Sequence, residues 1–485
     1  MHSNLQSGAA SHSPAFWSLL ALSLARFCSG AVDHSDDILI GHWLGALNKD
    51  VQVFYDISRK WDGSLMGYNG VVEFKLSGSP VEVVTLQNDT VHFEELESNQ
   101  RFVGVLDRDH LTISGQYANL NISNSWPLTL RRVEALPLPS RPQTPQKPRP
   151  YDEEEVVYKN KSAAINIAGT LALPRHTGLS PGVLIISGSG QQNRDGEGAF
   201  HRPFLVLADY LTSRGVAVLR VDDRGVGGTT RLGPFFDSTT KDLASDACAG
   251  VEFLKGRKEI DPKKVGLIGH SEGGLIASML AARESEVAFI VLLASPAGGK
   301  FSEGMTRQDS TEARAKGAND AETAVIVDWC SRFYNVALNT KDKGVARRTL
   351  QRMSDERTKE EKAAFEKTGL SGGTLDIDYA LTPHFHYLMS LNPDDFLKRI
   401  RCPVLALMGD KDTCGDSKFT LEATENQLKA GKNSNYKIQE FKNLNHLFQT
   451  VDPGNMRSPG DIEETFSPVA LDVIGSWISA ECQTQ

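Results

Sequence analysis

The stretch Gly269-His270-Ser271-Glu272-Gly273-Gly274 predicts the fold of most of this chain. A short apolar run, Val265-Gly266-Leu267-Ile268, precedes it, and a helix-forming run from Leu275 to Ala282 follows. A serine at a tight turn between a buried strand and a helix is typical of a nucleophile elbow. The serine takes a strained backbone conformation there, so small residues are needed at Gly269 and Gly273.

This turn predicts roles for two neighbouring residues. The elbow exposes the Ser271 hydroxyl at the edge of the sheet, where it can act as a nucleophile. The amide of Glu272 lies at the N-terminus of the following helix, where it can donate to an oxyanion. Because G-x-S-x-G also arises by chance in Gly- and Ser-rich chains, the rest of the sequence must support this interpretation.

Length and composition exclude several classes of protein. At 485 residues the chain is too long for one ordinary domain. A net charge of −9 gives no reason to expect nucleic acid or an anionic membrane as a partner. No apolar run is long enough to span a bilayer as a mature segment.

The N-terminus resembles a secretory signal. Phe16 to Ala25 is a short apolar run, and Ser29-Gly30-Ala31 offers a small-residue cleavage site. We therefore expect residues 1–31 to be a signal peptide and the protein to be secreted or periplasmic. No Lys or Arg precedes Phe16, so an N-terminal tail or a misassigned start is the alternative.

The cysteines give neither a disulfide framework nor a zinc site. Without the signal five remain, an odd and scattered set with no C-x-x-C spacing. We expect buried free thiols, with a Cys402–Cys414 bridge across a loop as the alternative.

Residues 32–134 predict a small all-β domain, barrel- or sandwich-like. Short alternating segments recur at roughly ten-residue spacing with turn signals between them. The expected strands include 51–57, 71–74, 81–86, 91–93, 102–106, 111–115 and 128–130. We expect a module that packs on the second domain. A glycan- or wall-binding module is the alternative, with Trp43, Trp61 and Trp126 as a stacking surface.

Residues 135–150 carry six prolines and predict a stiff linker. From 151 to 485 strands then alternate with helices, which predicts a doubly wound, mostly parallel sheet. Expected strands are 155–158, 165–173, 183–186, 216–221, 265–268, 289–294, 403–408 and 436–441, and expected helices are 202–213, 239–256, 275–282 and 466–480. The insertion at about 298–400 predicts a helical cap, with helices at 312–316, 321–334 and 354–367.

Two further residues complete a predicted catalytic triad with Ser271. Asp412 follows the strand 403–408 directly, with Asp410 as its rival, and His446 follows the last strand. The chain order Ser, Asp, His is that of α/β-hydrolases. Each residue alone is most often structural, but three in this order, each just past an apolar strand, are hard to obtain by chance.

Two loops predict supporting roles. The glycine-rich loop after strand 183–186 offers the amide of Ser189 as second oxyanion donor, with Gly190 as the alternative. In the loop after strand 216–221, we expect Asp222 and Arg224 to fix loops beneath the site by charge-assisted hydrogen bonds. The Arg and Asp pair would crowd a pyrophosphate, so this loop does not indicate dinucleotide binding.

Residues 152 to 480 resemble the α/β-hydrolase serine esterases of the EstD-like branch, related to the C-terminal domains of bile-acid-CoA:amino acid/acyl-CoA thioester hydrolases. The matching segments are Gly169-Thr170-Leu171, Ser187 to Gly190 with Arg194-Asp195, Asp222 to Gly227, Gly269 to Gly274, Thr382-Pro383, Cys402 to Leu405, Gly409 to Asp412 and Leu444 to Phe448. The sequence departs at Gln191, where the family usually has proline, and at His384, where it usually has an aromatic residue.

The resemblance implies a carboxylic-ester hydrolase with the triad Ser271, Asp412 and His446. It implies a small-molecule ester of short to medium acyl chain as substrate, and neither cofactor nor metal. A serine peptidase with the same triad is the nearest alternative, followed by a thioesterase or lactonase. A non-catalytic binding protein would carry a broken triad, and this one is intact.

Overall fold

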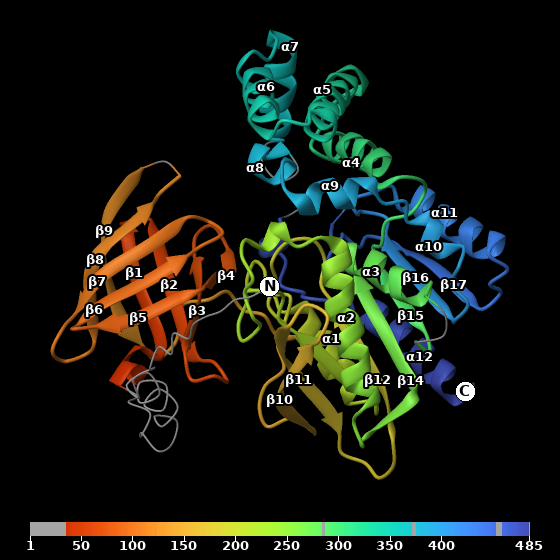
Figure 1. Ribbon diagram of the computed structural model, residues 1–485, viewed down its shortest axis with the longest axis horizontal. Coiled ribbons are helices and arrows are strands. Elements are labelled where there is room, and N and C mark those ends of the chain that lie inside the picture. The colour runs from red at the N-terminus through yellow and green to blue at the C-terminus, as the bar shows by residue number, and fades with distance from the viewer. Residues whose placement is uncertain (1–34, 122, 284–286, 371–374, 453–457, 485) are drawn as a thin grey trace, which may run out of the picture.

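The computed structural model describes residues 35–121, 123–283, 287–370, 375–452 and 458–484. The predicted signal peptide, residues 1–31, lies outside these ranges. An all-β part at the left of Figure 1 precedes a larger α/β part, above which several helices stand. The fold class predicted from the sequence is confirmed.

The first part is one antiparallel sheet of nine strands in the order β4-β3-β2-β1-β9-β8-β7-β6-β5. It curls until β3 and β4 contact β5 and β6, so it forms a nearly closed barrel. The strands are β1 (Gly41–Asn48), β2 (Val51–Arg59), β3 (Leu65–Val71), β4 (Leu76–Val81), β5 (Val83–Gln87), β6 (Thr90–Glu95), β7 (Gln100–Leu106), β8 (Thr112–Asn119) and β9 (Asn124–Val133). Alternate residues such as Trp43, Phe93 and Phe102 fill its core.

Two strand predictions in this part were wrong. Of the expected strand 71–74, only Val71 belongs to a strand, because residues 72–75 form the turn between β3 and β4. The single strand expected at 81–86 is divided between two strands, because β4 ends at Val81, β5 begins at Val83, and Glu82 separates them. The three tryptophans make no common stacking surface, since Trp43 is completely buried and Trp61 donates to the Gly228 carbonyl of the second part at 2.9 Å.

The second part is built on an eight-stranded sheet in the order β10-β11-β13-β12-β14-β15-β16-β17. β10 and β11 form an antiparallel pair at one end, and the pairs from β13 to β17 are parallel. The strands are β10 (Tyr151–Asn160), β11 (Ile165–Pro174), β12 (Ser180–Ile186), β13 (Ala217–Val221), β14 (Ile260–His270), β15 (Ile290–Leu293), β16 (Val404–Gly409) and β17 (Tyr436–Phe441). The central parallel strands β15 and β16 are buried and apolar on both faces because helices cover both, whereas the edge strand β17 is largely half-exposed.

Helices cover both faces of this sheet. α1 (Pro203–Thr212) and α12 (Pro468–Thr484) pack on one face, whereas α2 (Thr240–Lys255), α3 (Glu272–Ala281) and α11 (Ser417–Ala430) pack on the other. Both faces need a cover because apolar side chains alternate along β12: Val183 and Ile185 belong to one core, and Leu184 and Ile186 belong to the other. The carboxyl ends of the strands therefore meet at one edge, where the loops with the predicted site residues begin.

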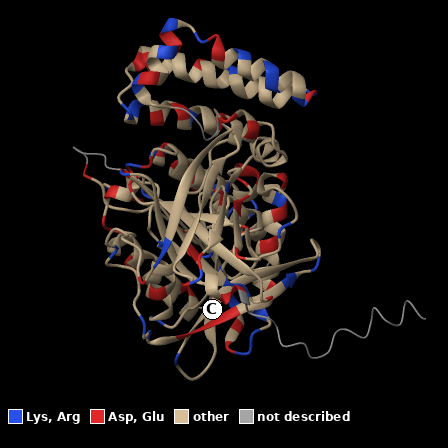
Figure 2. Ribbon diagram, turned by 90° about the vertical axis from the view of Figure 1, so that its left-hand side faces the viewer, with Lys and Arg blue, Asp and Glu red and all other residues tan. Residues whose placement is uncertain are grey.

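The segment between β15 and β16 is helical and has a core of its own. Its helices are α4 (Phe301–Ala315), α5 (Asp320–Asn339), α6 (Lys343–Asp355), α7 (Lys359–Thr368), α8 (Ile377–Ala380), α9 (Pro383–Ser390) and α10 (Asp394–Leu397). The helix expected at 354–367 is wrong in its extent, because Thr358 caps a new helix, α7, with Glu361. Figure 2 shows charges of both signs mixed along the helices at the top, as on a solvated face.

The two parts contact each other through polar and charged groups. Arg231, in the loop after β13, pairs with Glu82 at 2.8 Å and with Glu97 at 2.7 Å. The proline-rich linker is held down as well, because Arg141 donates to the carbonyls of Ala199 and Gly460. Among the described residues, no helix is both long and apolar enough to cross a membrane.

Candidate active site

The predicted strand, turn and helix around Ser271 are present. β14 ends at His270, α3 begins at Glu272, and Ser271 between them has φ 54° and ψ −119°. A positive φ is costly for a serine and is found where the surroundings enforce it. Crowding here is severe, because a Cβ at Gly269 would lie 2.1 Å from the carbonyl oxygen of Gly273. The turn therefore requires glycine at this position, as an elbow does.

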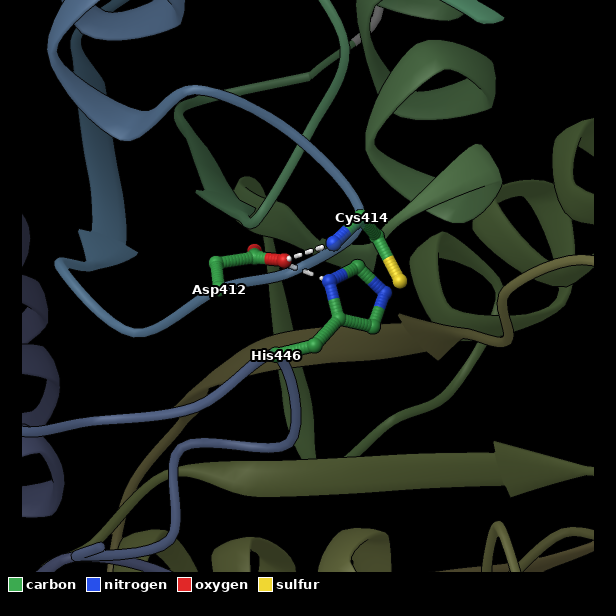
Figure 3. A group of neighbouring side chains, drawn as sticks. All are labelled: Asp412, Cys414 and His446. Atoms are coloured by element: carbon green, nitrogen blue, oxygen red, sulfur yellow. Dashed lines mark hydrogen bonds and ion pairs between the residues drawn. The ribbon is translucent and has the colours of Figure 1, made fainter. Parts of the chain in front are cut away.

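Asp412 and His446 meet at the carboxyl edge of the sheet (Figure 3). His446 Nδ1 donates to Asp412 Oδ2 at 2.9 Å, and the Asp412 side chain is buried. Asp410, the rival, instead accepts from the Asn443 amide at 2.6 Å and pairs with Lys411. Burial disfavours a charged His446, but the charge of Asp412, the neighbouring Cys414 and the hydrogen bond to Asp412 hold the pKa of His446 well above its usual value.

Ser271 shares its surroundings with this pair. A cavity of about 80 Å³ is lined by Ser271, Asp412 and His446, and a second, of about 350 Å³, is lined by Ser271 and His446. The structure thus brings the three predicted triad residues to one place from three separate loops. Asp412 orients the imidazole through Nδ1, which leaves Nε2 as the nitrogen available to a serine hydroxyl.

The two predicted oxyanion residues flank Ser271. Glu272 is the first residue of α3, and the first amides of a helix have no intrahelical acceptor. The loop after β12 lies directly against the serine, since a Cβ at Gly188 would be 3.2 Å from the Ser271 Cβ. Ser189 lines the larger cavity, and its hydroxyl donates to the Glu272 carboxylate at 2.7 Å.

Asp222 and Arg224 form separate ion pairs rather than one. Asp222 is paired with Arg194 of the loop after β12, at 2.7 Å, and also accepts from the Arg194 amide. Arg224 is paired with Asp246 of α2 at 2.6 Å. Each contact is a charge-assisted hydrogen bond between a loop at the carboxyl edge and a neighbouring segment.

Sequence reasoning missed three residues around the site. Asp223 accepts from the Ser187 hydroxyl and from the Gln192 amide, both at 2.8 Å, so it supports both ends of the loop that contains Ser189. His270 donates from Nε2 to the His446 carbonyl at 3.0 Å and thereby holds the backbone of the predicted base. Burial lowers the pKa of His270 to about 4, so its imidazole is neutral. In the sequence, each of the two could be recognised only as the neighbour of a candidate residue: Asp223 follows Asp222, and His270 precedes Ser271.

The third is Cys414, which the sequence analysis considered only as a bridge partner of Cys402 and not as a neighbour of His446. Its amide donates to Asp412 Oδ1 at 2.8 Å, and its sulfur lies beside the His446 ring in Figure 3. The Cys402–Cys414 bridge is not formed, because both residues are free thiols, and Cys414 is exposed rather than buried. Ligand-type atoms of Asp412, Cys414 and His446 lie within 4.8 Å of one another, so any metal bound here would occupy the candidate catalytic residues themselves.

Comparisons with known proteins find relatives of this chain. A family model described as "Alpha/beta hydrolase family" matches residues 183–455, more than half of the chain. Esterase EstD of Thermotoga maritima is 29% identical over 141 residues, which are 29% of this chain and 33% of that protein. An uncharacterized protein of Mycobacterium tuberculosis is 30% identical over 115 residues, 24% of this chain and 36% of that protein. The chain thus matches about a third of the length of these relatives.

Solved structures of similar outline include two esterases. The Pyrococcus furiosus esterase Pf2001 aligns with a TM-score of 0.41 and 16% identity over 71% of this chain and 97% of that one. Est1E from Butyrivibrio proteoclasticus aligns with a TM-score of 0.38 and 15% identity over 68% and 99%. With the family match over residues 183–455, the eight-stranded sheet and the elbow at Ser271, the chain belongs to the alpha/beta hydrolase family.

Proposed function

We propose that this protein is a serine esterase that cleaves carboxylic esters through an acyl-enzyme on Ser271. The observation that carries the proposal is the Asp412–His446 hydrogen bond beside a cavity that Ser271 also lines, from a strained strand-to-helix turn. The match to a relative named as an esterase supports ester chemistry. The same machinery serves several acyl transfers, so the substrate class must be tested separately.

The proposed reaction has two half-cycles. His446 removes the proton of Ser271 as its oxygen attacks the ester carbonyl carbon, and it then gives this proton to the departing alkoxide. Water repeats the cycle on the acyl-enzyme and releases the carboxylic acid. Asp412 keeps the Nδ1–H tautomer and stabilises the imidazolium that forms in each half-cycle.

The negative charge on the carbonyl oxygen is stabilised by the amides of Glu272 and Ser189. Each donor of this kind contributes about 3 kcal/mol to the barrier reduction. The closeness of the preceding residue supports this assignment, since a Cβ at Gly188 would lie 3.2 Å from the Ser271 Cβ.

The larger cavity is the proposed acyl site. Its volume is about 350 Å³, and its apolar lining includes Phe301, Met305, Phe385, Leu388 and Leu447. Ligand cavities of about 300–1,000 Å³ are typical of small-molecule sites. A cavity near the lower limit favours short to medium acyl chains.

The test is hydrolysis of p-nitrophenyl acetate, butyrate and octanoate, with aminoacyl-p-nitroanilides and an acyl-thioester in parallel. Ser271→Ala should lower ester turnover by about 10⁴- to 10⁶-fold. The control is Ser331→Ala, an exposed serine on α5 whose hydroxyl only contacts its own helix, and it should leave turnover unchanged. A fluorophosphonate should label Ser271, as located by peptide mass spectrometry.

The outcomes separate the candidate activities. Ester turnover that requires Ser271, without anilide cleavage, supports the esterase. Comparable or faster cleavage of anilides would indicate a peptidase, and a strong preference for thioesters would indicate a thioesterase. A folded protein with no turnover and no labelled serine would refute the proposal.

We also propose that residues 1–31 direct export, on the basis of the apolar run and small-residue site in the sequence. Expression of the full chain in a secreting host should yield an extracellular or periplasmic protein that has lost this segment. Retention of the intact N-terminus, measured by mass spectrometry of the exported protein, would contradict it.

A further inference from the structure

The Glu272 side chain lies at the centre of a buried hydrogen-bond network. Its carboxylate accepts from Ser189 Oγ at 2.7 Å, from Thr240 Oγ1 at 2.8 Å and from His384 Nε2 at 3.1 Å. The Glu272 side chain is 1% exposed and that of His384 is 0% exposed. A buried carboxylate is costly unless it is paired and hydrogen-bonded, so these contacts are what make it tolerable.

The contacts of His384 fix its protonation state. Nε2 faces the Glu272 carboxylate, and Nδ1 faces the Ser238 carbonyl at 2.9 Å. Burial opposes the ionisation of Glu272, but His384 and the hydroxyls of Ser189 and Thr240 lower the pKa of its carboxyl, which is therefore ionised. Both partners of His384 are then acceptors only, whereas a neutral imidazole has a single N–H. Only the imidazolium satisfies both contacts. Burial opposes this charge, but the hydrogen bond and the charge of Glu272 raise the pKa of His384 above its usual value.

The network joins four segments that are distant in the sequence. Glu272 follows Ser271 in the elbow, Ser189 belongs to the loop after β12, Thr240 begins α2, and His384 belongs to α9 of the helical insertion. The rings of Phe235, Phe236 and Tyr379 surround His384, with centroids 5.6 to 6.2 Å away. His384 of the helical insertion thus places a positive charge against the Glu272 carboxylate, next to the proposed oxyanion donors.

We propose that the Glu272–His384 ion pair is a positioning device for the oxyanion site: the carboxylate holds Ser189 toward Ser271, and the imidazolium cancels the negative charge of that carboxylate. The inference rests on the proposed function and extends it to His384 of the helical insertion. An uncompensated carboxylate next to the developing oxyanion would raise the energy of the transition state, because the local dielectric is low and both charges are negative.

The test uses His384→Phe, Glu272→Gln and the double variant. His384→Phe keeps an aromatic ring among aromatic neighbours but leaves the carboxylate unpaired, so kcat should fall about 10²-fold with little change in KM. Glu272→Gln keeps the backbone amide and removes the charge, so its loss should be about tenfold or less. The double variant has neither charge and should turn over about tenfold faster than His384→Phe. The matched control is His386→Phe on the same helix, which should behave like the wild type.

A boronic acid inhibitor separates the oxyanion effect from folding. Its tetrahedral adduct with Ser271 carries the negative charge of the transition state, so its affinity should fall together with kcat in His384→Phe. The affinity for the product carboxylic acid should not follow kcat. Circular dichroism and melting temperature identify a variant that merely unfolds. A His384→Phe protein with kcat and boronate affinity within threefold of the wild type would overturn the proposal, as would a double variant no faster than the single one.

Nitrogen NMR of the histidine rings gives a readout that is independent of turnover. At neutral pH, His384 should have both ring nitrogens protonated in the wild type and should lose one proton in Glu272→Gln. A neutral His384 in the wild type would refute the ion pair. If the wild type neither hydrolyses esters nor reacts with the boronic acid, the proposed function fails and the positioning role fails with it, whereas the NMR result still decides whether the ion pair exists.

Discussion

Replacing Asp412 by asparagine tests the candidate triad most directly. Asp412 accepts from His446 Nδ1 at 2.9 Å and from the Cys414 amide at 2.8 Å, and its side chain is 1% exposed. An asparagine has nearly the same shape, but its amide group can present a donor to His446 and select the wrong tautomer. We expect kcat for a p-nitrophenyl ester to fall about 10⁴-fold, which corresponds to about 5 kcal/mol of transition-state stabilisation.

The pH dependence of the same variant gives a second readout. His446 must be neutral to accept the serine proton, so kcat/KM should rise with pH through its pKa. In the wild type Asp412 holds that pKa well above its usual value, and the acid limb of the profile should therefore lie above pH 6.5. Asp412→Asn removes the negative charge, so the limb should move to lower pH while the plateau falls.

Asp410→Asn is the matched control. Asp410 lies two residues away and contacts the Asn443 amide and Lys411, so its replacement should cost less than about tenfold in kcat. Melting curves of both variants establish that they remain folded. Equal losses at Asp410 and Asp412, or an acid limb unmoved in Asp412→Asn, would refute the reasoning.

Three further predictions concern packing, the thiol and the insertion. Gly269→Ala should prevent folding or strongly lower the melting temperature, because its Cβ would lie 2.1 Å from the Gly273 carbonyl oxygen. The control is Gly190→Ala, where φ is positive but the surrounding space is open, and it should lower the free energy of unfolding in urea by only about 1 kcal/mol. Iodoacetamide should alkylate Cys414 and inactivate the wild type by filling the space beside His446, whereas Cys414→Ala should stay active and resist the reagent. Inactivation of that variant at the same rate would contradict the position of Cys414 beside His446. Burial raises the pKa of Asp309 to about 7, so the folded state holds a proton that the unfolded state has lost, and stability should fall as pH rises from about 4 to 7. Asp309→Asn should weaken this fall in melting temperature, and an unchanged pH dependence would contradict it.

Sequence periodicity predicted most elements of the α/β part, because its central parallel strands are buried on both faces and form short apolar runs, and its edge strands alternate polar and apolar residues. The strand at 436–441 was predicted to the residue, and the helices around 203–212 and 240–255 to within two residues. The pattern failed at residues 72–74, where the apolar Val72 and Phe74 lie in a turn, and near 356–358, where two helices with similar charge patterns adjoin. The local amino-acid sequence cannot distinguish a half-exposed turn from a strand when tertiary contacts decide which residues are buried.

By itself the sequence determined the nucleophile turn and the order of the candidate triad, because glycines, an apolar strand and a helix former act over a few neighbouring residues. Only the tertiary structure decided which distant groups meet: Asp412 rather than Asp410 at His446, Cys414 as a free thiol beside that ring, and His384 against Glu272. Such contacts join loops separated by tens to more than a hundred residues. They depend on how the sheet edge and the helical insertion pack, and no local pattern encodes that arrangement.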